Sequence, residues 1–228
     1  MNSRKKEIMV ISISGMIGSG KSTLSKLLNK KYENSLLLEE FSENDEIFNK
    51  YLEWIYSQKP NIDLSFQAYI TESLENSFNI ANKKFLSKNS HKNTHIFLDR
   101  FNIEHIIFAI VTLSKKEPRY LKAFLEMSEH LINLDNNPDL AIFLDINFEN
   151  VKDRIFKRGR KVEIDNFNEN FEYFFELHSI YKKEFINLTT KYKIPYVIID
   201  TNELSENEVF DKSIKIIENF DFTQSKRN

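Results

Sequence analysis

The chain has 228 residues, a formal net charge of −2 and no cysteine. That length suits one α/β domain, and 41% apolar residues can fill its core. The charge argues against a surface that coats nucleic acid or binds a membrane, and the lack of cysteine excludes disulfides and thiolate chemistry. The apolar run at residues 106–111 is too short to span a bilayer, so we expect a soluble cytoplasmic protein.

The first predicted elements are a buried strand at residues 8–13 and a helix that begins after residue 20. The loop between them fits the phosphate-binding pattern G-x-x-x-x-G-K-[ST]. Its glycines let backbone N–H groups face phosphate oxygens, and the helix N-terminus adds partial positive charge. We expect Lys21 to reach the β- and γ-phosphates of ATP and the Ser22 hydroxyl to ligate Mg²⁺. The predicted nucleotide-binding residues are Gly15, Gly18, Ser19, Gly20, Lys21, Ser22 and Thr23.

Strands and helices alternate along the rest of the chain. Further apolar runs typical of buried strands are residues 36–38, 96–98, 140–144 and 196–199. Segments with helical spacing are residues 47–55, 64–86, 103–134 with a break at Pro118, 148–158, 166–191 and 205–220. This alternation predicts a P-loop NTPase fold, with a five-stranded parallel sheet and helices on both faces. We expect a single domain over residues 1–228, with a frayed polar tail at residues 221–228.

Acidic residues follow the predicted strands, at the edge where parallel sheets bind ligands. Asp99 ends the third strand and offers a carboxylate to Mg²⁺ or its waters, and Arg100 beside it favours this role over turn capping. Glu39, at the tip of the second strand, is a candidate base for an attacking hydroxyl. Glu40 is the alternative, and a glutamate pair is also common at a solvated edge.

Three arginines, Arg154, Arg158 and Arg160, surround a helix end at Gly159. The helix dipole alone favours basic residues at such an end. Downstream of a phosphate loop, however, the pattern favours a lid over residues 154–165 whose guanidinium groups clamp the transferring phosphoryl group.

In order and spacing, these motifs resemble the deoxynucleoside kinase family over most of the chain. The resemblance implies that Glu39 is the base, although Glu40 stands where relatives usually have proline, and that Arg100 positions the 5′-hydroxyl. It also implies that Tyr56 contacts the sugar 3′-hydroxyl and that Glu163 is a second sugar-binding carboxylate.

The base-recognition residues both match and depart from this family. Gln67, in the sequence Phe-Gln-Ala-Tyr at residues 66–69, matches the glutamine that reads the base edge. Relatives selective for deoxycytidine or purines pair an Arg with an Asp, and these positions hold Leu74 and His105 here. We expect His105 to line the base pocket, but no base preference transfers directly.

The resemblance implies ATP- and Mg²⁺-dependent phosphorylation of a deoxynucleoside 5′-hydroxyl by a homodimer, nearest to the deoxyadenosine/deoxyguanosine branch. A thymidylate-type nucleotide kinase is one alternative, but it needs an Arg-Glu-Pro-Gly-like stretch where residues 38–41 read Leu-Glu-Glu-Phe. A non-catalytic nucleotide-binding regulator is another. The presence of Lys21, Glu39, Asp99 and the full arginine lid argues against it.

Overall fold

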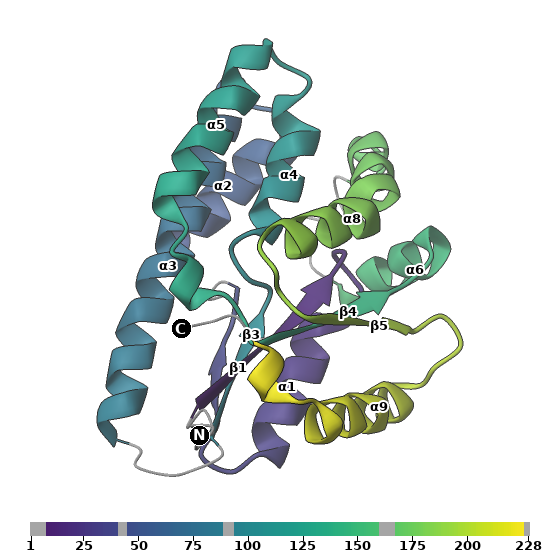
Figure 1. Cartoon of the computed structure of the whole chain (residues 1–228). Helices are drawn as coiled ribbons and strands as arrows, with labels where there is room; N and C mark the ends of the chain where they lie inside the picture. The colour runs from purple at the N-terminus through teal and green to yellow at the C-terminus, as the bar shows by residue number, and fades with distance from the viewer. Residues whose placement is uncertain (1–7, 41–44, 89–93, 160–166, 226–228) are drawn as a thin grey trace.

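The computed structural model describes residues 8–40, 45–88, 94–159 and 167–225. It contains a five-stranded sheet in the order β2-β3-β1-β4-β5, and every pair of neighbours is parallel (Figure 1). The strands are β1 Ile8–Gly15, β2 Leu36–Leu38, β3 Thr94–Asp99, β4 Leu140–Asp145 and β5 Tyr196–Asp200. The predicted sheet is confirmed. Its register pairs Ile13 with Asp99 and Gly15 with Leu144, so the phosphate loop lies beside the carboxyl ends of β3 and β4.

Helices connect the strands nearly as predicted. They are α1 Lys21–Lys31, α2 Glu46–Tyr56, α3 Asp63–Lys88, α4 Glu104–Leu113, α5 Pro118–Leu131, α6 Phe148–Arg158, α8 Phe171–Lys191 and α9 Glu206–Asn219, with 3₁₀ turns η1 Leu134–Asn136 and η2 Phe222–Gln224. The segment expected at residues 103–134 forms two helices. Pro118 begins the second of them, where its missing N–H leaves no bond unmade.

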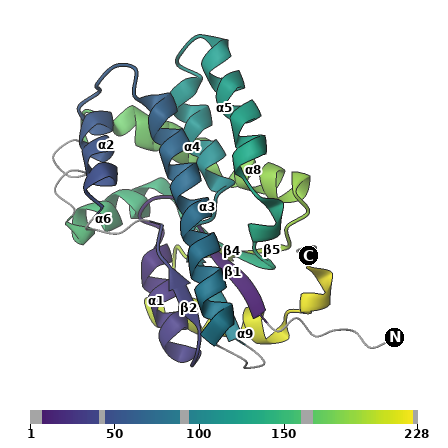
Figure 2. The ribbon, with the colours of Figure 1, turned by 90° about the vertical axis from the view of Figure 1, so that its left-hand side faces the viewer.

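Two hydrophobic cores lie on opposite faces of the sheet, because successive strand side chains alternate in direction. Ile11 and Ile142 pack on the face covered by α1 and α9. Val10 and Phe143 pack on the face covered by α3, α4 and α8 (Figures 1 and 2). Both faces of the sheet are therefore covered, as the continuous apolar strands require.

Helix α2 lies beyond the carboxyl end of the sheet, against the first turns of α3 (Figure 2). Asp45 caps it by accepting a hydrogen bond from the Phe48 N–H at 2.9 Å. The Tyr69 hydroxyl on α3 donates to the same carboxylate, 3.3 Å from Oδ2. Phe48 and Phe66 then pack together, with ring centroids 6.0 Å apart. These contacts hold α2 against α3, and the ring of Tyr56, the last residue of α2, stacks on Phe174 of α8 with the centroids 6.0 Å apart.

The C-terminal segment differs from the predicted frayed tail as far as residue 225. Phe222–Gln224 forms a 3₁₀ turn, and Phe220 and Phe222 pack against the core on the α1–α9 face. The Ser225 hydroxyl donates to the buried Asp139 carboxylate. Polar composition alone predicts a frayed end, whereas the packing of Phe220 and Phe222 holds this segment against the core.

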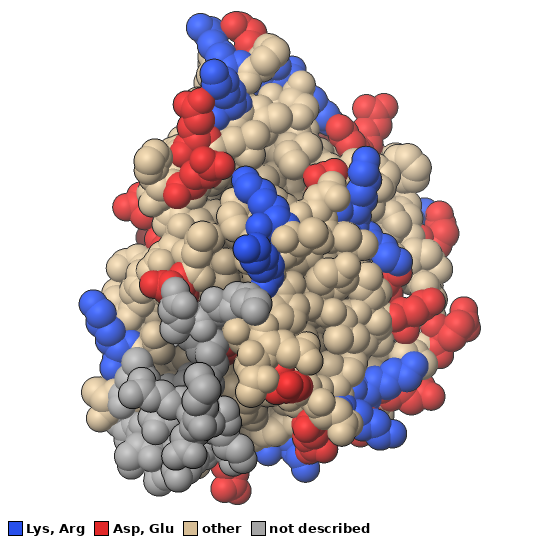
Figure 3. Space-filling model, in the orientation of Figure 1, with Lys and Arg blue, Asp and Glu red and all other residues tan. Residues whose placement is uncertain are grey.

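The surface carries both charge signs. On the face shown in Figure 3, acidic and basic side chains are interspersed from the top of the molecule to its lower right, as the small net charge predicts. Within the described residues, no helix combines the length and the apolar composition that crossing a membrane requires.

His95 is a buried imidazole on β3, where the Tyr32 ring meets it edge-on at a centroid distance of 4.6 Å. Burial lowers the pKa of His95 from 6.5 to about 4. The stability contributed by its neutral ring is complete above pH 6.5 and is lost as the pH falls from 6.5 to 4, where the unfolded chain binds the extra proton. Between pH 8 and pH 5, we expect the wild type to lose about 2 kcal/mol more unfolding free energy than His95→Gln does. Urea denaturation at both pH values measures this, and equal losses would contradict it.

Candidate active site

The phosphate loop is pressed between β4 and α6. Gly15 has φ 140°, and a Cβ there would lie 2.8 Å from the Leu144 carbonyl oxygen. Gly18 has φ 80°, and a Cβ there would lie 3.2 Å from Ile155 Cγ1. An L side chain at either position would be both strained and crowded. The glycines of the motif therefore allow the loop to fold tightly under α6.

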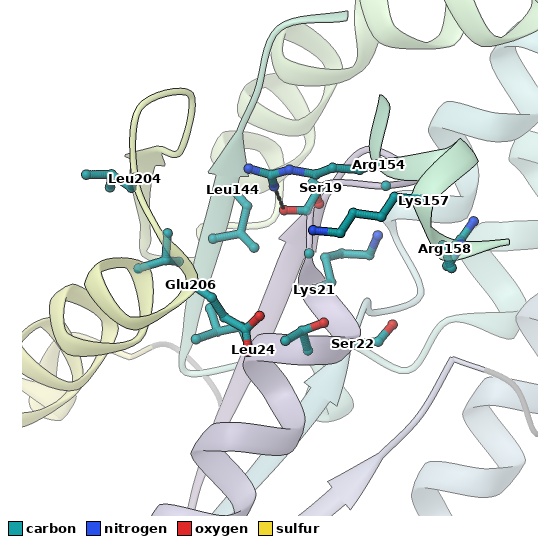
Figure 4. Close-up of a pocket in the computed structure, with 14 residues that line it drawn as sticks. Ser19, Lys21, Ser22, Leu24, Leu144, Arg154, Lys157, Arg158, Leu204 and Glu206 are labelled. Carbon is teal, nitrogen blue, oxygen red and sulfur yellow. Dashed lines mark hydrogen bonds between the residues drawn. The ribbon is translucent and has the colours of Figure 1, made fainter. Parts of the chain in front are cut away.

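A cleft of about 480 Å³ opens over this loop (Figure 4). Its lining includes six of the seven predicted nucleotide-binding residues: Gly18, Ser19, Gly20, Lys21, Ser22 and Thr23. Leu24 and Leu144 form part of the wall, and Leu204 and Val209 approach from the β5–α9 side. Lys157 also lines the cleft, and in Figure 4 its side chain extends over the loop between Ser19 and Lys21. The sequence did not single out Lys157, since it was one more basic residue at a helix end.

Lys21 places a buried cation at the loop. Its Nζ donates to the Met16 carbonyl oxygen at 3.0 Å. Burial, followed by the charge of Arg100, lowers the pKa of Lys21 from 10.5 to about 8. A polyanion in the cleft would relieve both effects, because it would replace the lost solvation and oppose the second cation. The loop is therefore suited to bind phosphate groups.

Asp99 and Ser22 meet at the carboxyl end of β3 and the start of α1. The Ser22 side chain lies beside the Asp99 carboxylate, whose Oδ1 is buried without a hydrogen-bond partner. Burial raises the pKa of Asp99, against the opposing effect of the Lys21 charge. An unpartnered carboxylate oxygen beside a hydroxyl fits Mg²⁺, which prefers oxygen ligands. Among the residues described, no group of three or more His, Cys, Asp or Glu could hold a metal, so phosphate oxygens and water would complete its coordination.

A second cavity, the acceptor cavity, shares Lys21, Ser22 and Arg158 with the cleft. Its polar lining includes Glu40, Tyr56, Gln67, Arg100 and His105, and its apolar lining includes Phe48, Leu52, Ile55, Phe66, Ile70 and Phe108. Gln67 Oε1 and His105 Nε2 are buried without hydrogen-bond partners. Unsatisfied polar atoms in an apolar cavity cost free energy until a ligand pairs with them. The cavity therefore suits a ligand with apolar faces and a polar edge.

The two glutamates after β2 lie on opposite sides. The Glu40 carboxylate pairs with Arg100 Nε at 2.8 Å, and its side chain is 16% exposed. The Glu39 carboxylate pairs with Lys26 on α1 at 2.8 Å, and its side chain is 43% exposed. Among the described residues that line the acceptor cavity, Glu40 is present and Glu39 is not. Glu39 is the base that the sequence predicts, and its carboxylate is directed at α1. The carboxylate of the alternative, Glu40, contacts Arg100.

Glu40 is ionised in this setting. Burial alone would raise its pKa, but the charges of Arg100, His105 and Lys21 lower the pKa below the ordinary value of 4.5. His105 Nε2 lies 3.8 Å from Glu40 Oε1, and burial lowers the pKa of His105 from 6.5 to about 4. At neutral pH the cavity thus holds a carboxylate beside a neutral imidazole.

Arg100 is fixed by its backbone as well as by its ion pairs. It has φ 72°, in the left-handed region that L residues avoid, and its N–H donates to the Ile13 carbonyl at 3.0 Å. The guanidinium lies 4.7 Å above the Phe108 ring and is almost fully buried. A strained residue with a buried charge marks a position held for function.

The lid residues fall partly within the structure. Arg154 on α6 donates from Nη1 to the Ser19 carbonyl at 2.9 Å and from Nη2 to the Thr201 carbonyl at 3.3 Å. Arg158 lines both the cleft and the acceptor cavity. Arg160 and Glu163 lie outside the described residues. Arg154 therefore joins the phosphate loop to the segment after β5, and Arg158 stands where the two cavities meet.

Comparisons with known proteins agree with this architecture. The family model for deoxynucleoside kinases matches residues 11–221. An uncharacterized protein of Mycoplasma pneumoniae is 29% identical over 201 residues, covering 86% of this chain and 84% of that protein. Deoxyadenosine kinase of Dictyostelium discoideum is 28% identical over 207 residues, covering 90% of this chain and 77% of that enzyme. The solved structure of deoxyadenosine kinase from M. mycoides, with the products dCMP and dCDP bound, has a TM-score of 0.74 at 24% identity and covers 93% of this chain and 100% of that one.

Proposed function

Because the chain belongs to the deoxynucleoside kinase family, we propose that it transfers the γ-phosphate of ATP to the 5′-hydroxyl of a deoxynucleoside. The observation that carries the proposal is the Glu40–Arg100 ion pair, which borders the acceptor cavity beside Lys21. In that position Glu40 could act as a base toward the acceptor hydroxyl, and Arg100 would lie beside the phosphate group. Transfer forms the 5′-O–Pγ bond and breaks the bond from Pγ to the ADP oxygen, and Glu40 accepts the hydroxyl proton.

Phosphoryl transfer asks a protein mainly for positioning and charge neutralisation. Lys21 and the loop N–H groups bind the triphosphate, and Arg158 and Arg160 neutralise the transferring group. When bound by Ser22 and Asp99, Mg²⁺ supplies further neutralisation of the phosphate oxygens. Arg154, which already bonds backbone on both sides of the cleft, stabilises the cleft wall.

The polar groups of the acceptor cavity suit the base edge of a deoxynucleoside, and relatives named deoxyadenosine kinase and deoxyguanosine kinase favour a purine. Gln67 and neutral His105 each offer a hydrogen bond to a base edge without demanding a charged partner. Leu74 lines neighbouring cavities and is not among the described residues around this one, so no side chain at that position reads the base here. Tyr56 and Glu163 are our proposed contacts to the sugar. We propose deoxyadenosine or deoxyguanosine as the preferred substrate.

Activity measurements with a panel of acceptors distinguish this function from its alternatives. Full-length protein with ATP and Mg²⁺ is offered the four deoxynucleosides, the four ribonucleosides and dTMP, and ADP release is measured with Lys21→Met as the inactive control. We expect the purine deoxynucleosides to be phosphorylated fastest. Turnover of dTMP alone would establish the thymidylate-type alternative, and ATP binding without any acceptor turnover would establish the regulator.

The structure argues physically against dTMP. An acceptor phosphate entering the cavity would approach the Glu40 carboxylate, whose lowered pKa keeps it ionised. Like charges in a largely buried site repel, so a phosphate beside Glu40 would be less favourable than a neutral group there. A neutral nucleoside hydroxyl has no such penalty.

We also propose that the enzyme works in the cytoplasm as a homodimer, as the family resemblance implies. ATP and free nucleosides are available there together. Light scattering of the purified protein tests the dimer directly.

A further inference from the structure

A fully buried carboxylate, Glu104, stands at the first position of α4, outside the predicted site. Its Oε2 accepts a hydrogen bond from the Gly15 N–H at 3.3 Å, at the start of the phosphate loop. Its Oε1 accepts one from the Phe101 N–H at 3.4 Å, directly after Arg100. One carboxyl group therefore accepts hydrogen bonds from the backbone of the phosphate loop and from the backbone next to Arg100.

A tyrosine on α8 extends this link to the Arg100 side chain. The Tyr181 hydroxyl donates to Glu104 Oε2 at 2.8 Å and accepts a hydrogen bond from Arg100 Nη1. The Tyr181 ring is held against Phe143, at a centroid distance of 6.1 Å, and edge-on to Phe108, at 5.9 Å. An unbroken chain of hydrogen bonds thus runs from Arg100 through Tyr181 and Glu104 to Gly15.

This arrangement is costly for the fold. Burial raises the pKa of Glu104 from 4.5 to about 7, although Arg100 and Lys21 oppose the shift. Replacing buried polar networks with well-packed apolar residues is often neutral or stabilising. A carboxyl group retained at this point, with bonds to the phosphate loop, to the Arg100 turn and to Tyr181, indicates a positioning role.

We propose that Glu104 and Tyr181 are positioning residues that align the phosphate loop with the Arg100–Glu40 pair. Neither is among the described residues that line the cleft or the acceptor cavity, so both act through Gly15 and Arg100. Their loss would leave substrate binding intact and loosen the alignment of the two reacting groups. Small misalignments of that kind lower the rate of the chemical step.

Tyr181→Phe tests the proposal because it removes only the hydroxyl and keeps the ring packing. The kinetic readout rests on the kinase activity proposed above. We expect kcat to fall about tenfold, with the KM values for ATP and deoxynucleoside within about twofold of wild type. Tyr196→Phe is the matched control, since the Tyr196 ring packs on Phe185 at 5.8 Å, away from the site. A kcat for Tyr181→Phe equal to that of the control would overturn the proposal while leaving the kinase function standing.

A second readout does not depend on activity. In wild type, the hydrogen bond to Tyr181 should restrict rotation of the Arg100 guanidinium, so that its N–H groups give separate, slowly exchanging signals in ¹H–¹⁵N NMR spectra. These signals are assigned by their absence in Arg100→Lys. We expect Tyr181→Phe and Glu104→Gln to merge or broaden these signals. Unchanged NMR signals in Tyr181→Phe would refute the positioning role even if no nucleoside is phosphorylated. If Glu104→Gln does not fold, the result for Tyr181→Phe alone decides.

Discussion

Glu40→Gln is expected to lower kcat by about 10²–10⁴-fold, the usual effect of losing a general base, whereas Glu39→Gln stays within about twofold of wild type. The difference follows from where the two carboxylates lie. Glu40 pairs with Arg100 at 2.8 Å beside the acceptor cavity, and Glu39 pairs with Lys26 on α1. An amide at position 40 keeps the size of the side chain and cannot take the hydroxyl proton.

The two variants control for each other, because they make the same chemical change at adjacent positions. Steady-state rates with saturating ATP and deoxynucleoside give kcat, and thermal melting checks that both variants fold. Since Glu40 faces the acceptor, its loss should also weaken deoxynucleoside binding more than ATP binding. An inactive Glu39→Gln beside a nearly normal Glu40→Gln would return the base role to Glu39.

The sheet and the phosphate loop were predictable because their signals are local. Each strand is a short apolar run, and the loop is a contiguous motif with glycines where φ is positive. Such features depend on neighbours in sequence, so one chain is enough to read them.

The directions of the two glutamates were also encoded locally, in the alternation of strand side chains. Leu36 and Leu38 pack on the face covered by α3 and α4, and Leu37 packs on the face covered by α1. Continuing that alternation for two residues directs Glu39 to α1 and Glu40 to Arg100. Spacing relative to the family motif favoured Glu39, and the pleat of the strand favours Glu40.

The contacts of Glu104 had no such signal. Tyr181 is 77 positions from Glu104 and lies on a helix whose spacing predicts only burial. Gly15 is 89 positions away. Long-range hydrogen bonds between single side chains leave no periodic pattern, so only the folded chain brings them together.

Arg100→Leu should destabilise the protein by about 3–5 kcal/mol and abolish turnover. Arg100 Nε pairs with Glu40 at 2.8 Å, and Nη1 lies 3.7 Å from Glu104, so its loss leaves the largely buried Glu40 and the fully buried Glu104 without this cation. Arg119→Leu on α5 is the control, because Arg119 is 69% exposed and its surface pair with Glu117 contributes at most about 1 kcal/mol. Urea denaturation of the three proteins measures the difference.

The pH dependence of that loss separates lost charge from lost packing. Without Arg100, the pKa values of Glu40 and Glu104 should rise, since the charge of Arg100 lowers both in wild type. A carboxyl whose folded pKa is raised binds a proton that the unfolded chain has released, so stability falls as the pH rises above the unfolded value of about 4.5. The deficit of Arg100→Leu relative to wild type should therefore be larger at pH 8 than at pH 5. A deficit equal at the two pH values would mean that Arg100 stabilises the fold through contact with Phe108 and Tyr181 and that its charge contributes nothing.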